Sequence, residues 1–136
     1  MKKIYLSLIL TIIWTLPALS NEQNVKDRQN AMQQIREVVK VLFPIAKEKT
    51  EYDDFLVISM LEQMFEAAKP YATYFPDQPE VAVHSEAAET IWTDRAGFEK
   101  ALAVFLSDIE KILDAEPETL EQFQPLFGNL ASNCKN

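Results

Sequence analysis

Apolar residues recur in this chain with the period of an amphipathic helix, and this spacing constrains the fold more than any other feature. Over about residues 86–114 such a stripe lies along one face of a helix. The chain has only two glycines and no sustained alternation of apolar and polar residues. The sequence therefore predicts an all-α protein. The residues of this first stripe are Ile91, Phe98, Phe105 and Ile112, seven residues apart, with Leu102 and Ile109 beside them.

A second stripe predicts a helix over about residues 22–48. Arg28 stands in it among apolar residues. Pro44 lies inside the helix and removes one backbone hydrogen bond, so we expect a kink in the last turns. The side chains expected to face inward are Val25, Arg28, Met32, Ile35, Val39, Leu42 and Ala46.

Capping residues and prolines divide the rest of the chain. We expect Thr50 to cap a helix that ends near Lys69, because Pro70 disfavours helical backbone in the residue before it. Pro117 suits the first position of a last helix. Residues 70–85, which follow the second predicted helix, hold three of the seven prolines and are typical of a crossover loop. The prediction is an antiparallel, up-down four-helix bundle with a longer loop between helices 2 and 3. The last helix should turn inward Leu120, Phe123, Phe127, Leu130 and Cys134.

The first twenty residues have the features of a secretory signal. "MKK" gives a positive start, an apolar run follows, and Ala18 and Ser20 have the spacing that a signal peptidase reads. We expect cleavage after Ser20, one domain over 21–136, export to the periplasm and no membrane association afterwards. An uncleaved N-terminal anchor is the alternative.

The chain is acidic, with 21 acidic and 13 basic residues and a formal net charge of −8. This argues against nucleic acid as a partner, because phosphate binding needs clustered lysines and arginines. It is compatible with a soluble partner that carries a basic patch. No nucleophile–base arrangement and no phosphate-binding loop is visible in the sequence, so we expect a carrier or binding protein rather than an enzyme.

Cys134 is the only cysteine, so it cannot form an internal disulfide. In an exported protein it is a free thiol, an intermolecular bridge or an attachment point. His84 is the only histidine and lies in the predicted loop. We expect it to be a solvated side chain rather than a metal ligand.

Four short motifs, spread over nearly the whole mature chain, resemble the cytochrome c′ family, the class II c-type cytochromes. "RQNAM" at 28–32 is similar to the opening Arg-x-x-x-Met of the family, and "YFPDQ" at 74–78 to its Phe-Pro segment. "ETIWTDRAGF" at 89–98 resembles its Ile-Trp…Phe signature. "ETLEQFQPLFGNLASNCKN" at 118–136 is similar to the stretch that leads into its Cys-x-x-Cys-His haem motif.

The resemblance implies a periplasmic haem c protein that binds iron and exchanges single electrons with a redox partner protein. It implies Cys134 as the first thioether cysteine and Met32 as an axial iron ligand, as in the low-spin branch. Arg28 would pair with a haem propionate, and Trp92 and Phe98 would line the haem. Family members are often dimers, so the resemblance leaves a homodimer open.

The sequence stops at Asn136, before the second cysteine and the histidine of the haem motif. For the polypeptide as written, we therefore expect poor or absent covalent haem attachment. One alternative is a haem-free bundle that acts as an interaction or scaffold module, in which Met32 and Arg28 merely pack and Cys134 bridges two subunits. Another is haem held without a covalent bond, or by one thioether at Cys134.

Overall fold

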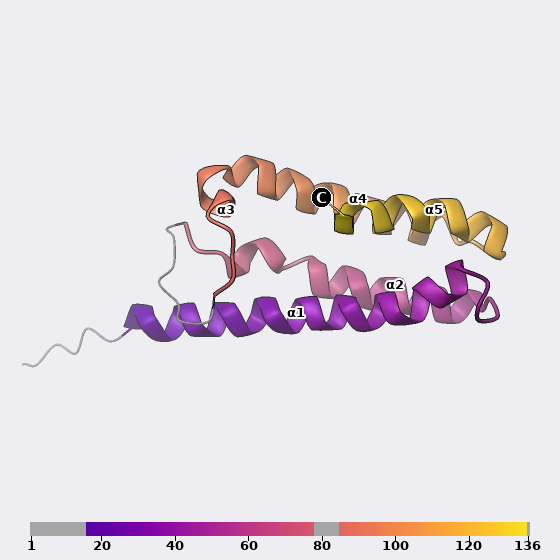
Figure 1. The fold of residues 1–136 in the computed structure, drawn as a ribbon, viewed down its shortest axis with the longest axis horizontal. Helices are drawn as coiled ribbons and strands as arrows, with labels where there is room; N and C mark the ends of the chain where they lie inside the picture. Colours follow the sequence, from indigo (N-terminus) through magenta and orange to yellow (C-terminus); the bar gives the residue numbers. More distant parts are fainter. Residues whose placement is uncertain (1–15, 78–84, 136) are drawn as a thin grey trace, which may run out of the picture.

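The computed structural model describes residues 16–77 and 85–135, and these ranges form helices and connections without a strand (Figure 1). Four main helices make an antiparallel bundle, as the sequence predicts. Three short helical turns lie between or after them. The main helices are α1 (Leu16–Ala46), α2 (Asp54–Ala68), α4 (Arg95–Ala115) and α5 (Leu120–Ser132), and the short ones are η1 (Tyr71–Tyr74), α3 (Thr90–Thr93) and η2 (Asn133–Lys135).

The bundle has two layers, which Figure 1 shows one above the other. α1 packs along α2 in one layer and α4 along α5 in the other, and contacts between α2 and α4 and between α1 and α5 join the layers. The short α1–α2 and α4–α5 connections lie at the same end of the molecule (Figure 1). The Tyr52 hydroxyl in the first connection donates a hydrogen bond to the main-chain oxygen of Pro117 in the second, so the two connections brace each other.

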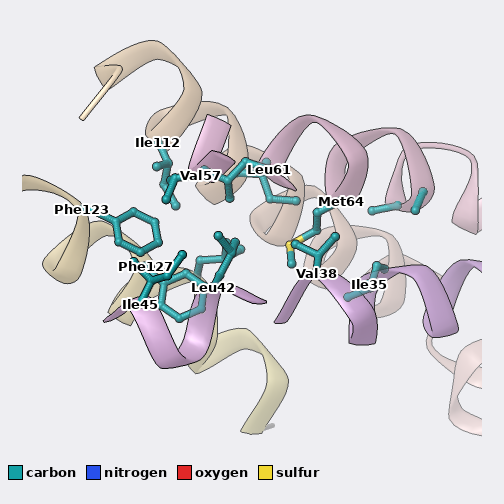
Figure 2. Close-up of a cluster of buried hydrophobic side chains, with 14 residues drawn as sticks. Ile35, Val38, Leu42, Ile45, Val57, Leu61, Met64, Ile112, Phe123 and Phe127 are labelled. Atoms are coloured by element: carbon teal, nitrogen blue, oxygen red, sulfur yellow. The ribbon is translucent and has the colours of Figure 1, made fainter. Parts of the chain in front are cut away.

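The buried core draws side chains from all four main helices (Figure 2). On α4, only Ile109 and Ile112 are buried, and both lie in the last turns of the helix. Phe98, Leu102 and Phe105, earlier in the same stripe, are half-buried. The interior is therefore tightly closed near the short connections and less so beside the first half of α4. Each large apolar side chain that is fully buried contributes about 1.5–3 kcal/mol.

The buried face of α1 is offset from the predicted face. Met32, expected to point inward, is 44% exposed, and Val39 and Ala46 are only half-buried. An α-helix drifts by about 20° per heptad from a strict seven-residue seam, and α1 contacts both α2 and α5. The inward direction predicted for Met32 is therefore wrong. The residues that α1 buries are Val25, Arg28, Ala31, Ile35, Val38, Leu42 and Ile45.

Two capping predictions are also wrong. α2 begins after Asp53, not after Thr50, because the Asp53 carboxylate accepts a hydrogen bond from the Leu56 amide at 2.8 Å. Pro117 does not begin α5. It is fully buried ahead of the true N-cap, Thr119.

The predicted third helix is two helices. Helical structure begins at Thr90 rather than near 86, and the backbone leaves the helical conformation at Asp94. The carboxylate of Asp94 then caps α4 by accepting a hydrogen bond from the Gly97 amide at 3.1 Å. α3 is thereby held as a separate turn at the start of α4.

Most of the predicted leader, 1–20, and His84 lie outside the described residues. The predicted end of the second helix before Pro70 is confirmed, since α2 ends at Ala68. Pro44 lies inside α1, which ends two residues later. Within 16–77 and 85–135, no helix is both long enough and apolar enough to cross a membrane.

Candidate functional site

A cleft of about 510 Å³ lies beside the first half of α1. This volume falls within the range of small-molecule and cofactor sites, about 300–1,000 Å³. Its walls come from α1, from the region of η1 and from the segment that leads into α3. The residues that matter most below are Arg28, Met32, Tyr71, Phe75 and Ile91.

Met32 presents its side chain on the α1 wall of this cleft, one turn after Arg28. With 44% of its surface exposed, it is not a core residue. A thioether is a known axial ligand of haem iron and tends to raise the reduction potential. Met32 is thus accessible to a group bound in the cleft.

Arg28 lies in the same wall but is only 6% exposed. Its Nη1 donates to the main-chain oxygen of Tyr74 at 2.9 Å, and its Nη2 donates to Ser85 Oγ at 3.1 Å. The guanidinium carbon stands 4.5 Å from the centre of the Phe75 ring. Such contacts offset the cost of burying a cation. The inward direction predicted for Arg28 is therefore confirmed.

Three side-chain donors hold the last residue of η1 and the two residues after it by their main-chain oxygens. Besides the bond from Arg28 to Tyr74, Arg95 Nη1 donates to the oxygen of Phe75 at 3.1 Å. Trp92 Nε1 donates to the oxygen of Pro76 at 2.8 Å. Each of three consecutive carbonyl groups therefore has a donor from α1, α3 or α4. The start of the crossover loop is fixed against the bundle in this way.

Phe75 is the centre of an aromatic cluster. It is 5% exposed, and its ring centre lies 4.9 Å from that of Phe98, 5.5 Å from that of Tyr71 and 6.1 Å from that of Trp92. All three pairs are edge-to-face, a geometry worth about 0.5–1.5 kcal/mol each beyond the buried area. Trp92 and Phe98 stand behind Phe75 and do not themselves line the cleft.

Tyr71 and Phe75 are cleft residues that the sequence analysis did not single out. Burial raises the pKa of Tyr71, and the nearby charge of Arg28 partly opposes this rise. The phenol is therefore neutral at ordinary pH. The signal that could have identified both residues is the density of aromatic side chains in the loop sequence "PYATYFP".

Cys134 lies in η2, beyond the end of α5, and its thiol is exposed. The predicted stripe is confirmed for Phe123, Phe127 and Leu130, which are buried, but not for the cysteine. The α-helix gives way at Asn133 to a 3₁₀ turn, which has three residues per turn and so rotates Cys134 out of the stripe. The inward direction predicted for Cys134 is therefore wrong. An exposed thiol is, however, accessible to a reaction partner.

The turn that carries Cys134 lies against the middle of α4. Asn133 Nδ2 donates to Asp108 Oδ2 at 2.9 Å. Phe105, one turn earlier on α4, is half-buried, whereas Ile109 is fully buried. The cysteine thus stands level with the point where the closed core ends. No group of three or more His, Cys, Asp or Glu residues in the described part of the chain could hold a metal ion by itself.

Residues 23–136 match the sequence profile of the family described as Cytochrome C'. This chain belongs to the cytochrome c′ family. The match covers most of the sequence, including the cleft, the aromatic cluster and Cys134. The resemblance drawn from the four short motifs is confirmed. The chain is accordingly a haem-binding c-type cytochrome, and its family's cofactor is haem c.

Solved structures agree with this assignment. A cytochrome c′ structure superposes with a TM-score of 0.75 at 25% sequence identity, covering 85% of this chain and 90% of the other. Cytochrome c′ from Rubrivivax gelatinosus gives 0.76 at 22% identity, with 85% and 91% covered. A variant of cytochrome c prime from Alcaligenes xylosoxidans, solved as a nitric oxide complex, gives 0.75 at 24% identity, with 85% and 90% covered. The Rubrivivax and Alcaligenes structures, both under 25% identical, show that this chain shares their fold. No curated protein sequence matches the chain.

The cleft of this cytochrome c′ chain has the chemistry that a haem group requires. Its walls carry an accessible thioether at Met32, a buried cation at Arg28 and apolar or aromatic side chains at Phe75 and Ile91. The iron of haem accepts a soft ligand, its propionate groups pair with a cation, and its macrocycle packs against an apolar surface. The residues present therefore fit the group.

Proposed function

We propose that this protein holds haem c in the cleft beside α1 and carries single electrons in the periplasm. Membership of the cytochrome c′ family supports the cofactor. The observation that carries the location is the pairing of an accessible methionine with a buried arginine one turn away on the same wall. The iron of such a group supplies the one-electron couple.

In this proposal Met32 would supply its sulfur as a ligand to the iron from the α1 wall of the cleft. Arg28 is placed to donate to a propionate, because charge-assisted bonds from a guanidinium to a carboxylate are short and strong. Tyr71 and Phe75 provide the apolar wall that excludes water. Trp92 and Phe98 act behind Phe75, by fixing its ring.

Cys134 is the proposed attachment residue. Its S–H would add across a vinyl double bond of the haem, with the sulfur going to the carbon next to the macrocycle and the hydrogen to the terminal carbon. The addition consumes no electrons and releases no leaving group. The exposure of the thiol supports this role, because a buried thiol could not reach a second molecule.

Small-gas binding is a second candidate function. A similar protein from Alcaligenes xylosoxidans has been solved with nitric oxide. A methionine on iron would compete with a gas ligand for the same position, so the state of Met32 separates the two functions. Family membership does not favour a haem-free scaffold.

We also propose export to the periplasm and a redox partner with a basic surface. The signal-like sequence at 1–20 and the formal net charge of −8 support these two points. Whether a second copy of the chain binds is best decided by sedimentation of the haem-loaded protein.

The test of the haem site is titration of the purified protein with haem, followed by absorption and electron paramagnetic resonance spectra. We expect a shifted Soret band for the wild-type chain. Met32→Ala should change both the absorption and the electron paramagnetic resonance spectra of the bound haem, because it removes the sulfur ligand. Met60→Ala is the matched control, because Met60 is a half-buried methionine of α2 outside the cleft. A wild-type chain without a Soret shift, or a Met32→Ala spectrum like that of Met60→Ala, would contradict the proposal.

A further inference from the structure

We infer that Asp108 on α4 is a positioning residue for Cys134, because it holds against α4 the turn that carries this thiol. The inference rests on the attachment role proposed above for Cys134. It concerns the residues that orient the thiol and not the haem cleft itself.

Both oxygens of the Asp108 carboxylate are engaged. Oδ2 accepts the bond from Asn133 Nδ2 at 2.9 Å, and Oδ1 accepts one from Lys111 Nζ at 2.7 Å. The Asp108 side chain is 13% exposed, whereas that of Lys111 is 64% exposed. The carboxylate is therefore shielded on the side of Asn133, and the lysine holds it from the solvent side.

Asn133 connects this carboxylate to the end of α5. Its main-chain N–H closes the last turn by donating to the oxygens of Leu130 and Ala131. Its side-chain amide also donates to the Leu130 oxygen at 3.2 Å. One side chain thus caps the helix and is itself fixed by Asp108. Cys134 follows directly, so its main-chain position depends on this contact.

A similar set of bonds elsewhere in the chain lacks this tertiary role. Glu37 accepts from Lys40, three residues later, at 2.8 Å and from the amide of Gln33 at 2.6 Å. All of these residues lie on α1, and Glu37 is 53% exposed. Asp108 differs because its amide partner belongs to another element. Glu37 is therefore a matched control for the loss of a lysine–amide pair.

The expected effect on attachment follows from geometry. A thiol adds to a double bond only while the two reacting atoms are held about 3–3.5 Å apart in the correct orientation. Helix ends fray readily unless their last carbonyl groups have partners. Without the contact to Asp108, η2 would spend more time away from α4, and the thiol would reach the reacting geometry less often.

The experiment compares wild-type protein with Asp108→Ala, Asp108→Asn and Glu37→Ala. The first measurement is amide hydrogen exchange of residues 130–134 in haem-free protein. The second is the fraction of Cys134 that forms a thioether after incubation with haem under reducing conditions, detected by mass spectrometry after acid–acetone extraction. Asp108→Ala should exchange these amides at least ~10-fold faster, the low end of the effect of losing a bond to a charged acceptor. Its thioether yield should fall several-fold.

Asp108→Asn keeps an oxygen acceptor for Asn133, so its amide exchange and its thioether yield should both stay close to those of the wild type. Glu37→Ala should match wild type in both. Unchanged exchange in Asp108→Ala, or faster exchange with an unchanged thioether yield, would overturn the positioning role. A wild-type chain that forms no thioether would instead overturn the attachment role of Cys134, and the exchange data would then identify the Asp108 contact as structural only.

Discussion

Arg28 on α1 donates a hydrogen bond to the main-chain oxygen of Tyr74, 46 residues later in the chain, at 2.9 Å. This contact ties the first helix to the last residue of η1, at the end of the bundle opposite the short connections. The Phe75 ring lies against the same guanidinium at 4.5 Å. The arginine therefore shapes the cleft, whatever group it also meets there.

Replacing Arg28 should destabilise the protein even without haem. Arg28→Met removes the donor to Tyr74 and should lower the free energy of unfolding by about 1.5–3 kcal/mol, the range for bonds to charged groups. Arg28→Lys should not restore it, because an ammonium cannot both stack on Phe75 and span two acceptors. Urea unfolding of haem-free protein measures the change. Arg36→Met, at an exposed position of the same helix, should stay within about 0.5 kcal/mol. A similar small change for Arg28→Met would contradict the structural role.

The four-helix bundle could be predicted because heptad stripes and prolines are local signals. The apolar stripe at 91–112 gives helical structure whatever the neighbours are. The break at Asp94 could not be predicted in the same way, because the stripe continues through it. Only the structure shows that the Asp94 carboxylate turns back to the Gly97 amide.

The candidate site was predictable in part for a similar reason. Sequence spacing places Arg28 and Met32 one turn apart, but it cannot say which of them the neighbouring helices cover. The structure buries the arginine and exposes the methionine. The direction of Cys134 depends on the 3₁₀ turn at Asn133, and that turn depends on a contact with Asp108, 25 residues earlier. Periodicity carries no information about such a contact.

The two glycines should respond differently to alanine. A Cβ at Gly128 meets nothing within 4 Å, so Gly128→Ala should stabilise the protein by about 0.5–1 kcal/mol through helix propensity. A Cβ at Gly97 would clash with Asp94 Oδ2. Gly97→Ala should therefore lose the cap of α4, which costs about 1 kcal/mol and cancels the gain.

Chemical denaturation of both variants measures this difference. Asp94→Ala provides the control: once the cap is absent, Gly97→Ala should stabilise the chain as Gly128→Ala does. Equal gains for both glycines in the wild-type background would show that Asp94 does not hold α4.

Glu116 ends α4 in the left-handed conformation, with φ 41° and ψ 59°. This conformation is strained for a residue with a Cβ but not for glycine. Glu116→Gly removes this strain. Glycine also has more freedom in the unfolded chain, which offsets part of the gain, so the net stabilisation should be ~0.5–1 kcal/mol. Glu110→Gly, at an exposed position inside the same helix, should destabilise it by about 1 kcal/mol. Thermal unfolding of the two variants should shift in opposite directions, and a downward shift in both would refute the assignment of strain.

The bond from Tyr52 to the Pro117 oxygen should be measurable as a stability change. Tyr52→Phe keeps the ring beside Phe123, whose centre is 5.8 Å away, and removes only the hydroxyl. We expect a loss of about 0.5–1.5 kcal/mol in urea unfolding. Tyr74→Phe is the control, since within the described ranges no hydrogen bond from the Tyr74 hydroxyl occurs. Equal effects of the two variants would rule out the brace between the connections.

Asp108 should make stability depend on acid pH. Its bonds with Lys111 and Asn133 hold the pKa of its carboxyl below the ordinary value. A carboxyl with a lowered pKa in the folded state stabilises that state above its unfolded pKa of about 3.9, and the contribution disappears as pH falls through the folded pKa. Asp108→Asn should therefore be less stable than wild type at pH 6, and the gap should narrow below about pH 4. Unfolding curves at a series of pH values test this, with Glu37→Gln as the control. A gap of constant size down to pH 2 would mean that the charge of Asp108 does not stabilise the fold.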